Sequence, residues 1–105
     1  MNIQIITFSL DGLSEQDYLR LIESAAPAFA ELPGLVSKTW LANAKTNTYG
    51  GVYLWQDRES MEGYAETNVF KQMTANPNFK NLTVREFDVP EGSSRITRGL
   101  TQATA

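Results

Sequence analysis

The sequence predicts a single α+β domain in which two β-α-β halves form a ferredoxin-like unit. Three observations carry this prediction. The length of 105 residues suits one domain, four short segments have the composition of strands, and two helical stretches separate them in the order β-α-β-β-α-β. We place the domain at residues 1–90. We expect residues 91–105, rich in Ser, Thr, Gly and Ala, to form a tail that is extended or packed on a partner subunit.

The first half begins with a strand over residues 3–10, which is rich in Ile, Thr and Phe and ends at an Asp-Gly turn. Ser14 is placed to cap a helix whose apolar positions step by three and four residues, as one face of a helix requires. Pro27 lies inside this pattern. Because proline lacks a backbone donor, it predicts a kink or an early end of the helix.

The second half contains further strand-like and helix-like segments. They lie at residues 35–42, 49–56, 58–67 and 82–89. The polar turn at residues 43–47 predicts an antiparallel hairpin between the first two. Within that hairpin, Gly50 and Gly51 predict a bulge or a point where another group comes close to the backbone.

Both faces of the predicted sheet carry large apolar side chains. In the third strand, Val52 and Leu54 point one way, whereas Tyr53 and Trp55 point the other. Helices cover only one face, and an exposed apolar patch of several hundred Å² is unusual in a monomer. A second copy is the economical cover for the other face. The sequence therefore predicts a homodimer, a dimeric α+β barrel whose interior between the two sheets holds a small molecule.

The composition excludes several kinds of site. The chain has no cysteine, so disulfides and thiolate metal sites are excluded, and no histidine, so the usual Ser-His-Asp triad and the commonest metal-ligand sets are excluded. The formal charge of −3 argues against a nucleic-acid partner. No phosphate-binding glycine loop is present, so we expect no cofactor and no metal. With neither a signal-peptide pattern nor a long apolar run, we expect no membrane partner and a cytoplasmic protein.

Four strings of residues resemble the YdhR-type monooxygenase family. They are PGLVSKTW at 33–40, YGGVYLW at 49–55 followed by Asp57, FDV at 87–89 and SRI at 94–96. The resemblance runs over most of the chain and implies a dimeric α+β barrel. The wider superfamily includes cofactor-free monooxygenases of polycyclic phenols and quinones, haem-degrading enzymes, and isomerases or cyclases. The haem-degrading members use a histidine ligand, which this chain lacks.

Aromatic and cationic side chains are the candidates for a site. The expected catalytic residues are Trp40, Tyr53 and Arg85, and the expected substrate-binding residues are Phe8, Lys38, Trp55 and Tyr64. Aromatic rings would stack a flat ligand, and a cation would hold a phenolate. The alternatives are plain core packing for the rings, and solvent exposure or ion pairs with Glu86 or Asp88 for the cations. These two carboxylates could share a proton, although charges on strand edges often only prevent aggregation.

Together with these residues, the resemblance implies a cofactor-independent monooxygenase that acts on a small hydrophobic aromatic molecule of phenol or quinone type. The segment over residues 69–79, with its Asn-Pro-Asn break, could act as a lid over the site. Two alternatives stay open. One is a non-catalytic module that binds such a ligand, for example in a stress response, and the other is an isomerase or cyclase on the same scaffold.

Overall fold

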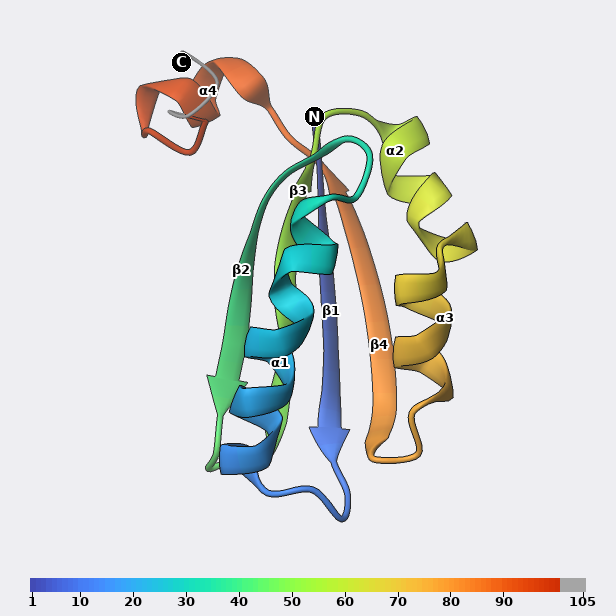
Figure 1. Cartoon of the computed structure of the whole chain (residues 1–105). Coiled ribbons are helices and arrows are strands. Elements are labelled where there is room, and N and C mark those ends of the chain that lie inside the picture. Colours follow the sequence, from blue (N-terminus) through green and yellow to red (C-terminus); the bar gives the residue numbers. More distant parts are fainter. Residues whose placement is uncertain (101–105) are drawn as a thin grey trace.

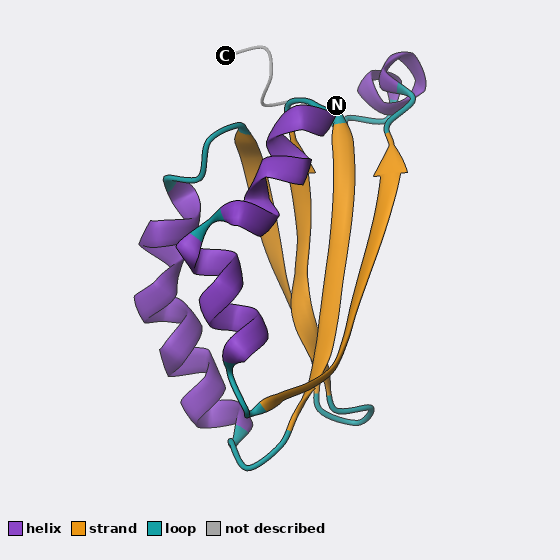
Figure 2. Cartoon of the chain, turned by 90° about the vertical axis from the view of Figure 1, so that its right-hand side faces the viewer, coloured by secondary structure: helices purple, strands orange, loops and turns teal. Residues whose placement is uncertain are grey.

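The computed structural model describes residues 1–100, which form a four-stranded sheet with helices packed on one of its faces (Figures 1 and 2). The elements, in chain order, are β1 (Asn2–Leu10), α1 (Glu15–Ala30), β2 (Leu35–Asn43), β3 (Thr48–Trp55), α2 (Arg58–Gly63), η1 (Tyr64–Glu66), α3 (Asn68–Ala75), β4 (Phe79–Asp88) and α4 (Glu91–Ile96). The predicted α+β class and the order β-α-β-β-α-β are confirmed. No helix within residues 1–100 is long and apolar enough to cross a membrane.

The strands lie in the order β2-β3-β1-β4, and every neighbouring pair is antiparallel. This is the arrangement of a ferredoxin-like unit, with β1 in the middle of the sheet. Ile6 of β1 lies opposite Gly51 of β3, whereas Ile5 lies opposite Val52 of β3 and Arg85 of β4. Because directly opposed residues share a face, this register separates a helix-covered face from an open face.

Helix α1 differs from the prediction at its C-terminal end. Ser14 caps the helix as predicted, since its side chain accepts a hydrogen bond from the backbone N–H of Asp17. The predicted early end at Pro27 is wrong, because the helix runs on to Ala30. Pro27 has no N–H to donate to the backbone carbonyl of Glu23, and Glu23 is an exposed residue. Water can satisfy that carbonyl, so the helix tolerates the proline.

The predicted second helix, over residues 58–67, is divided into α2 and the 3₁₀ turn η1, and the separate helix α3 follows it. Asp57 caps α2 by accepting from the backbone N–H of Ser60, and the helix ends at Gly63. A single 3₁₀ turn follows, and Thr67 then caps α3 with its own side chain. Residue 67 is extended rather than helical, because a capping residue must leave the helical conformation. After the break, α3 runs along the sheet beside β4 (Figure 1).

The hydrophobic core lies between the helices and the covered face of the sheet. Its main cluster contains the buried side chains of Ile6, Phe29, Leu32, Tyr53, Trp55, Met61 and Tyr64. A second cluster, Phe8, Tyr18 and Tyr49, lies at the other end of the same face. Aromatic residues therefore make up most of the hydrophobic core, and a chain of this size forms a single core of this kind.

Gly50 and Gly51 confirm the predicted close approach to the backbone. Gly50 has a φ of 143°, and a Cβ added to it would lie 1.9 Å from the carbonyl oxygen of Ile6. A Cβ added to Gly51 would lie 2.6 Å from Cε of Lys38. The first glycine lets β3 come against β1, and the second leaves room for the lysine side chain to cross the sheet.

Residues 91–100 are partly helical rather than extended, and the other expected arrangement of this tail, packing on a partner subunit, stays a prediction. Residues 91–96 form α4, which lies past the end of the sheet, away from the other helices (Figure 2). Beyond it, Leu100 is 3% exposed and lines a small hollow on the open face with Ile3 and Leu54. The amino terminus forms an ion pair with Glu91, which ties the two ends of residues 1–100 together. Residues 101–105 lie outside the described part of the chain.

We expect Gly50→Ala to lower the free energy of unfolding by roughly 2–4 kcal/mol, because a side chain there is strained and meets the Ile6 carbonyl. Urea denaturation measures the change. Gly63→Ala is the matched control, since nothing lies within 4 Å of a Cβ added at that helical position. It should leave stability unchanged or raise it by up to about 1 kcal/mol. Equal effects of the two substitutions would contradict this account.

Candidate functional site

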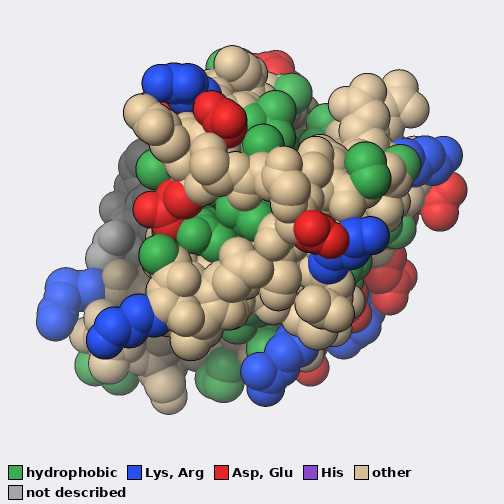
Figure 3. Space-filling model, turned by 90° about the horizontal axis from the view of Figure 1, so that it is seen from below, with side chains coloured by type: hydrophobic (Ala, Val, Ile, Leu, Met, Phe, Trp, Pro, Cys, Tyr) green, Lys and Arg blue, Asp and Glu red, His purple; other side chains and the backbone are tan. Residues whose placement is uncertain are grey.

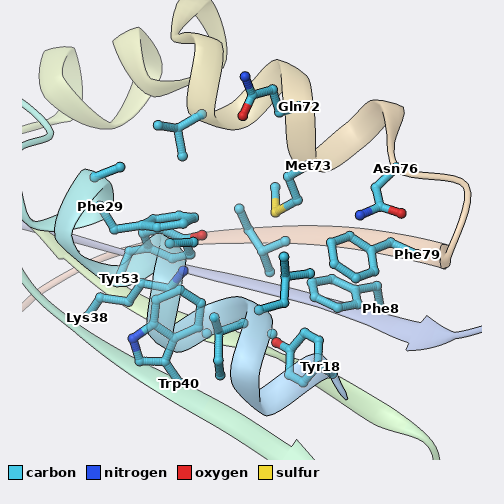
Figure 4. A pocket seen from close by; sticks show the side chains of 18 residues that line it. Phe8, Tyr18, Phe29, Lys38, Trp40, Tyr53, Gln72, Met73, Asn76 and Phe79 are labelled. Atoms are coloured by element: carbon cyan, nitrogen blue, oxygen red, sulfur yellow. The ribbon is translucent and has the colours of Figure 1, made fainter. Parts of the chain in front are cut away.

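A pocket of about 260 Å³ lies between α1, α3 and the covered face of the sheet (Figure 4). Its volume is close to the lower end of the ~300–1,000 Å³ that is usual for small-molecule sites. Most of the 18 lining side chains are apolar, and Lys38 is the single charged one. This pocket lies on the helix side of the sheet, and the expected ligand space between two sheets stays a prediction. Gly50 and Gly51 form a floor without side chains on the helix side of this sheet, and the hollow opens there.

The sheet and two helices supply the walls of the pocket. Strands provide the floor and one end, α1 provides one wall and α3 the other (Figure 4). The residues that define these surfaces are Ile6, Phe8, Lys38, Trp40, Tyr53 and Phe79 from the strands, Tyr18, Ile22, Ala25 and Phe29 from α1, and Val69, Gln72 and Met73 from α3. None of the residues of α3 is fully buried. Seen from below, the surface between the elements shows apolar side chains among polar ones (Figure 3).

Lys38 is held among aromatic rings. Its Nζ lies 3.3 Å from the ring centroid of Trp40, 3.5 Å from that of Phe29 and 4.4 Å from that of Tyr53. Within residues 1–100, none of the ion pairs involves this lysine. Burial without a carboxylate partner lowers the pKa of Lys38 from its ordinary 10.5 to about 6.

The rings oppose this effect, because their faces attract the charged ammonium. A cation–π contact is worth about 0.5–2 kcal/mol, and one pKa unit corresponds to about 1.4 kcal/mol. The rings therefore act against the shift that burial causes. Burial lowers the pKa of Lys38 toward neutrality, and the aromatic faces stabilise the ammonium that forms when the amine takes up a proton.

Trp55 and Tyr64 belong to the core behind the pocket. Neither lines it, and both lie instead beside a separate small hollow near Leu32 and Pro33. Trp55 donates from Nε1 to Oε1 of Gln4, and the hydroxyl of Tyr64 is 2.9 Å from that of Tyr53. Burial raises the pKa of both tyrosines, so the pair stays protonated and serves to fix the Tyr53 ring.

Arg85 is not in this pocket. It lies opposite Ile5 on the open face of the sheet and is exposed, with its guanidinium carbon 5.6 Å from the ring centroid of Phe87. Glu86 and Asp88 are on the helix side but at the sheet edge, where they accept hydrogen bonds from Gln4 and Asn2. The structure thus brings together four of the seven expected residues, Phe8, Lys38, Trp40 and Tyr53.

Sequence reasoning missed the part of the site that comes from α1 and α3. Helical spacing marks Tyr18 only as one of the apolar positions of α1, yet its hydroxyl is buried beside the pocket. The signal that was available is a tyrosine, rather than a phenylalanine, on the buried face of a helix. The expected lid over residues 69–79 does cover the pocket through Val69 and Met73, and whether it opens stays a prediction.

A family model matches this chain over residues 3–100, that of the family described as "Putative mono-oxygenase ydhR". The chain belongs to this family. The match spans both helix walls and the sheet floor of the pocket, so the pocket is part of the family domain. No curated protein matches the chain.

Solved structures of the same fold include enzymes of two kinds. SnoaB, a cofactor-independent oxygenase from Streptomyces nogalater, is 20% identical, with a TM-score of 0.68 over 85% of this chain and 92% of its own. The haem degrader MhuD from Mycobacterium tuberculosis, with two haems bound in its active site, is 19% identical. Its TM-score is 0.69 over 86% of this chain and 96% of its own. At these identities the likeness establishes the fold of this ydhR-family chain, not its activity.

The pocket of this chain does not fit haem. The chain has no histidine and no cysteine to bind the iron. Lys38 is the single cation among the lining residues, whereas a haem carries two carboxylates. Within residues 1–100, no group of three or more His, Cys, Asp or Glu side chains is placed to hold a metal ion.

We expect the stability cost of burying Lys38 to depend on pH. The folded-state pKa is below the unfolded one, so between about pH 6 and 10.5 the unfolded chain binds more protons. Stability therefore rises with pH in this window. Relative to Lys38→Met, the wild type should gain up to about 1 kcal/mol per pH unit, with partial exposure and the rings reducing the full effect. Urea unfolding of both proteins at pH 6, 8 and 9.5 measures this.

Lys45→Met serves as the control for this experiment. Lys45 is exposed in the turn between β2 and β3. Its substitution should shift stability by an amount that does not change with pH. A pH-independent difference between the wild type and Lys38→Met would contradict the assignment of a desolvated amine.

Proposed function

We propose that this ydhR-family protein is a cofactor-independent monooxygenase that oxidises a small aromatic molecule of phenol or quinone type in the pocket between its helices and its sheet. One observation carries the proposal. A desolvated lysine amine, without a carboxylate partner, lies in an apolar pocket between aromatic rings. The likeness in fold to a cofactor-independent oxygenase supports the same reading.

The first step is the transfer of a proton from the phenol or activated C–H group of the substrate to the neutral amine of Lys38. The products are an aromatic anion and an ammonium, which stabilise each other in the low-dielectric pocket. Trp40 and Phe29 favour the ammonium through their ring faces. Burial keeps the pKa of Lys38 near the working pH, which makes it a base that an ordinary surface lysine is not.

The second step needs no group from the protein beyond a dry, shaped cavity. The electron-rich anion reduces O₂, and a CH₂ group of the substrate becomes a carbonyl. One oxygen atom enters the product and the other leaves as water, so that all four electrons come from the substrate. Phe8 and Tyr53 hold the ring of the substrate by stacking, and the apolar walls exclude water.

We expect the protein to consume one O₂ per molecule of an anthrone-type substrate, without added flavin or metal. The rate should fall as pH drops through the pKa of Lys38, because the protonated amine is not a base. Lys38→Arg should lower kcat by about 10²–10⁴-fold, the usual contribution of a general base. Lys45→Arg, in an exposed turn, should leave the rate unchanged. An oxygen electrode and product analysis measure these rates.

The alternatives give different results in the same assay. A binding module holds the compounds of this panel and turns over none of them. An isomerase or cyclase forms product under nitrogen, where the oxygenase is silent. Rates with and without O₂ therefore separate the three functions, whereas affinities do not. The expected cytoplasmic location stays a prediction, which fractionation of cells that produce the protein would test.

We also propose that the protein is a homodimer. The open face of the sheet carries Ile5, Val52 and Phe87, of which Phe87 is 44% exposed. An apolar face of this kind on two copies would be covered if the sheets packed together. This arrangement leaves the pocket on the far side of each sheet, against its own helices.

We expect Val52→Asp to convert the dimer to a monomer, because it places two charges in the apolar interface. Light scattering coupled to gel filtration measures the mass. Gln16→Asp, on the exposed side of α1, is the control and should remain dimeric. A monomeric wild type would refute the proposal, and circular dichroism checks that Val52→Asp is folded.

A further inference from the structure

The hydroxyl of Tyr18 is buried and makes no hydrogen bond. The residue is 1% exposed, and its Oη is the single buried side-chain oxygen or nitrogen within residues 1–100 that has no partner. Leaving such a group unsatisfied costs about 1–3 kcal/mol, and native structures rarely do so without a reason.

Packing does not explain the hydroxyl. The ring of Tyr18 is held by edge contacts with Phe8, Tyr49 and Phe79, at centroid distances of 5.9, 5.1 and 6.0 Å. A phenylalanine would make the same ring contacts without burying a polar atom. The neighbouring tyrosine solves the same problem differently, since Tyr49 donates its hydroxyl to the carboxylate of Glu15. Tyr18 has the same phenol in the same cluster and no such acceptor.

The position of the hydroxyl relates it to the pocket. Tyr18 lines the pocket, and Figure 4 shows its oxygen turned toward the side where Lys38 and Trp40 lie. Burial and the nearby Tyr49 raise the pKa of Tyr18 to about 12, so the phenol is protonated at physiological pH and acts as a donor. A group that satisfies it must therefore be an acceptor. The oxygen is fully covered in this structure, so an acceptor that enters through the pocket reaches it when the side chains covering it move aside.

We propose that Tyr18 binds the ligand of this pocket by donating a hydrogen bond to a carbonyl oxygen of an aromatic ketone or quinone. The pocket then has two polar contacts with different tasks, a neutral donor at Tyr18 and a base at Lys38. An apolar pocket alone binds an aromatic hydrocarbon and an aromatic ketone by shape. The Tyr18 hydroxyl favours the molecule that bears a carbonyl, because its oxygen accepts the hydrogen bond that the hydroxyl otherwise lacks. The inference rests on the proposed function for the pocket being the ligand site, and it does not depend on turnover.

A matched pair of probes tests this inference. 1-Tetralone and tetralin have the same two-ring skeleton and differ in that a CH₂ group of tetralin replaces the carbonyl. Tyr18→Phe should weaken binding of 1-tetralone about threefold to tenfold, the value of one hydrogen bond, and leave binding of tetralin unchanged. NMR titration of the full chain measures both affinities. Tyr49→Phe removes a hydroxyl from the same cluster but outside the pocket, and should change the two affinities equally.

Infrared spectroscopy gives a second readout that a purely structural role would not move. The carbonyl stretch of ¹³C-labelled 1-tetralone should shift to lower frequency on binding to the wild type and should lose that shift in Tyr18→Phe. In the absence of ligand, Tyr18→Phe should be at least as stable as the wild type, because it removes an unsatisfied buried group. Tyr49→Phe should be less stable, because it leaves Glu15 without its donor.

The outcomes separate this inference from the proposed function. Equal weakening of 1-tetralone and tetralin by Tyr18→Phe, or an unshifted carbonyl stretch in the wild type, overturns the role of Tyr18. Selective binding through Tyr18 without oxygen consumption on any substrate supports the inference and sinks the oxygenase. If neither probe binds, the inference about Tyr18 fails, whereas oxygen consumption with an anthrone-type substrate still decides the proposed function.

Discussion

The absence of side chains at Gly50 and Gly51 is the constraint on which the rest of the site depends. At Gly50 the backbone of β3 comes so close to the Ile6 carbonyl that any Cβ would collide with it. At Gly51 the missing side chain is replaced by the stem of Lys38, which lies across the sheet. The lysine side chain can therefore lie over Gly51 with its amine against the rings of Phe29 and Trp40. The same two glycines give the pocket its floor.

Lys38 combines two environments that usually exclude each other. Desolvation favours the neutral amine, and aromatic faces favour the ammonium. The pKa of Lys38 is lowered by desolvation, and the rings reduce the free-energy cost of taking up a proton. A carboxylate in place of the rings would have kept the lysine charged at all times and removed its use as a base. Aromatic surroundings thus leave the amine neutral, so that it can accept a proton, and stabilise the ammonium once it has done so.

How much the sequence could predict differs between the fold and the site. Alternation along the strands placed Val52 and Tyr53 on opposite faces correctly, because a strand has a fixed period of two residues. The same alternation put Lys38 and Tyr53 on one face. Both faces of the sheet are apolar, so alternation alone could not show which face binds the ligand. For this reason the prediction grouped Arg85, which lies on the open face, with residues of the covered face. The sequence places a tyrosine at position 18, within the helix, but the lack of a hydrogen-bond partner for its hydroxyl is a property of the packed structure, not of helical spacing.

Two polar groups of the pocket, on Lys38 and Tyr18, destabilise the unliganded protein. The Lys38 amine has lost its hydration without gaining a carboxylate, and the Tyr18 hydroxyl has lost its hydration without gaining an acceptor. Each lowers the stability of the unliganded fold, and each is recovered by a ligand that offers an acidic proton to one and a carbonyl oxygen to the other. Binding energy that comes from relieving such costs is selective, because a hydrocarbon of the same shape relieves neither. The core around them is rigid and aromatic, with Tyr53, Trp55 and Tyr64 in mutual ring contact. Such a core can hold both groups in place while the ligand is absent, which is what preorganisation of a site requires.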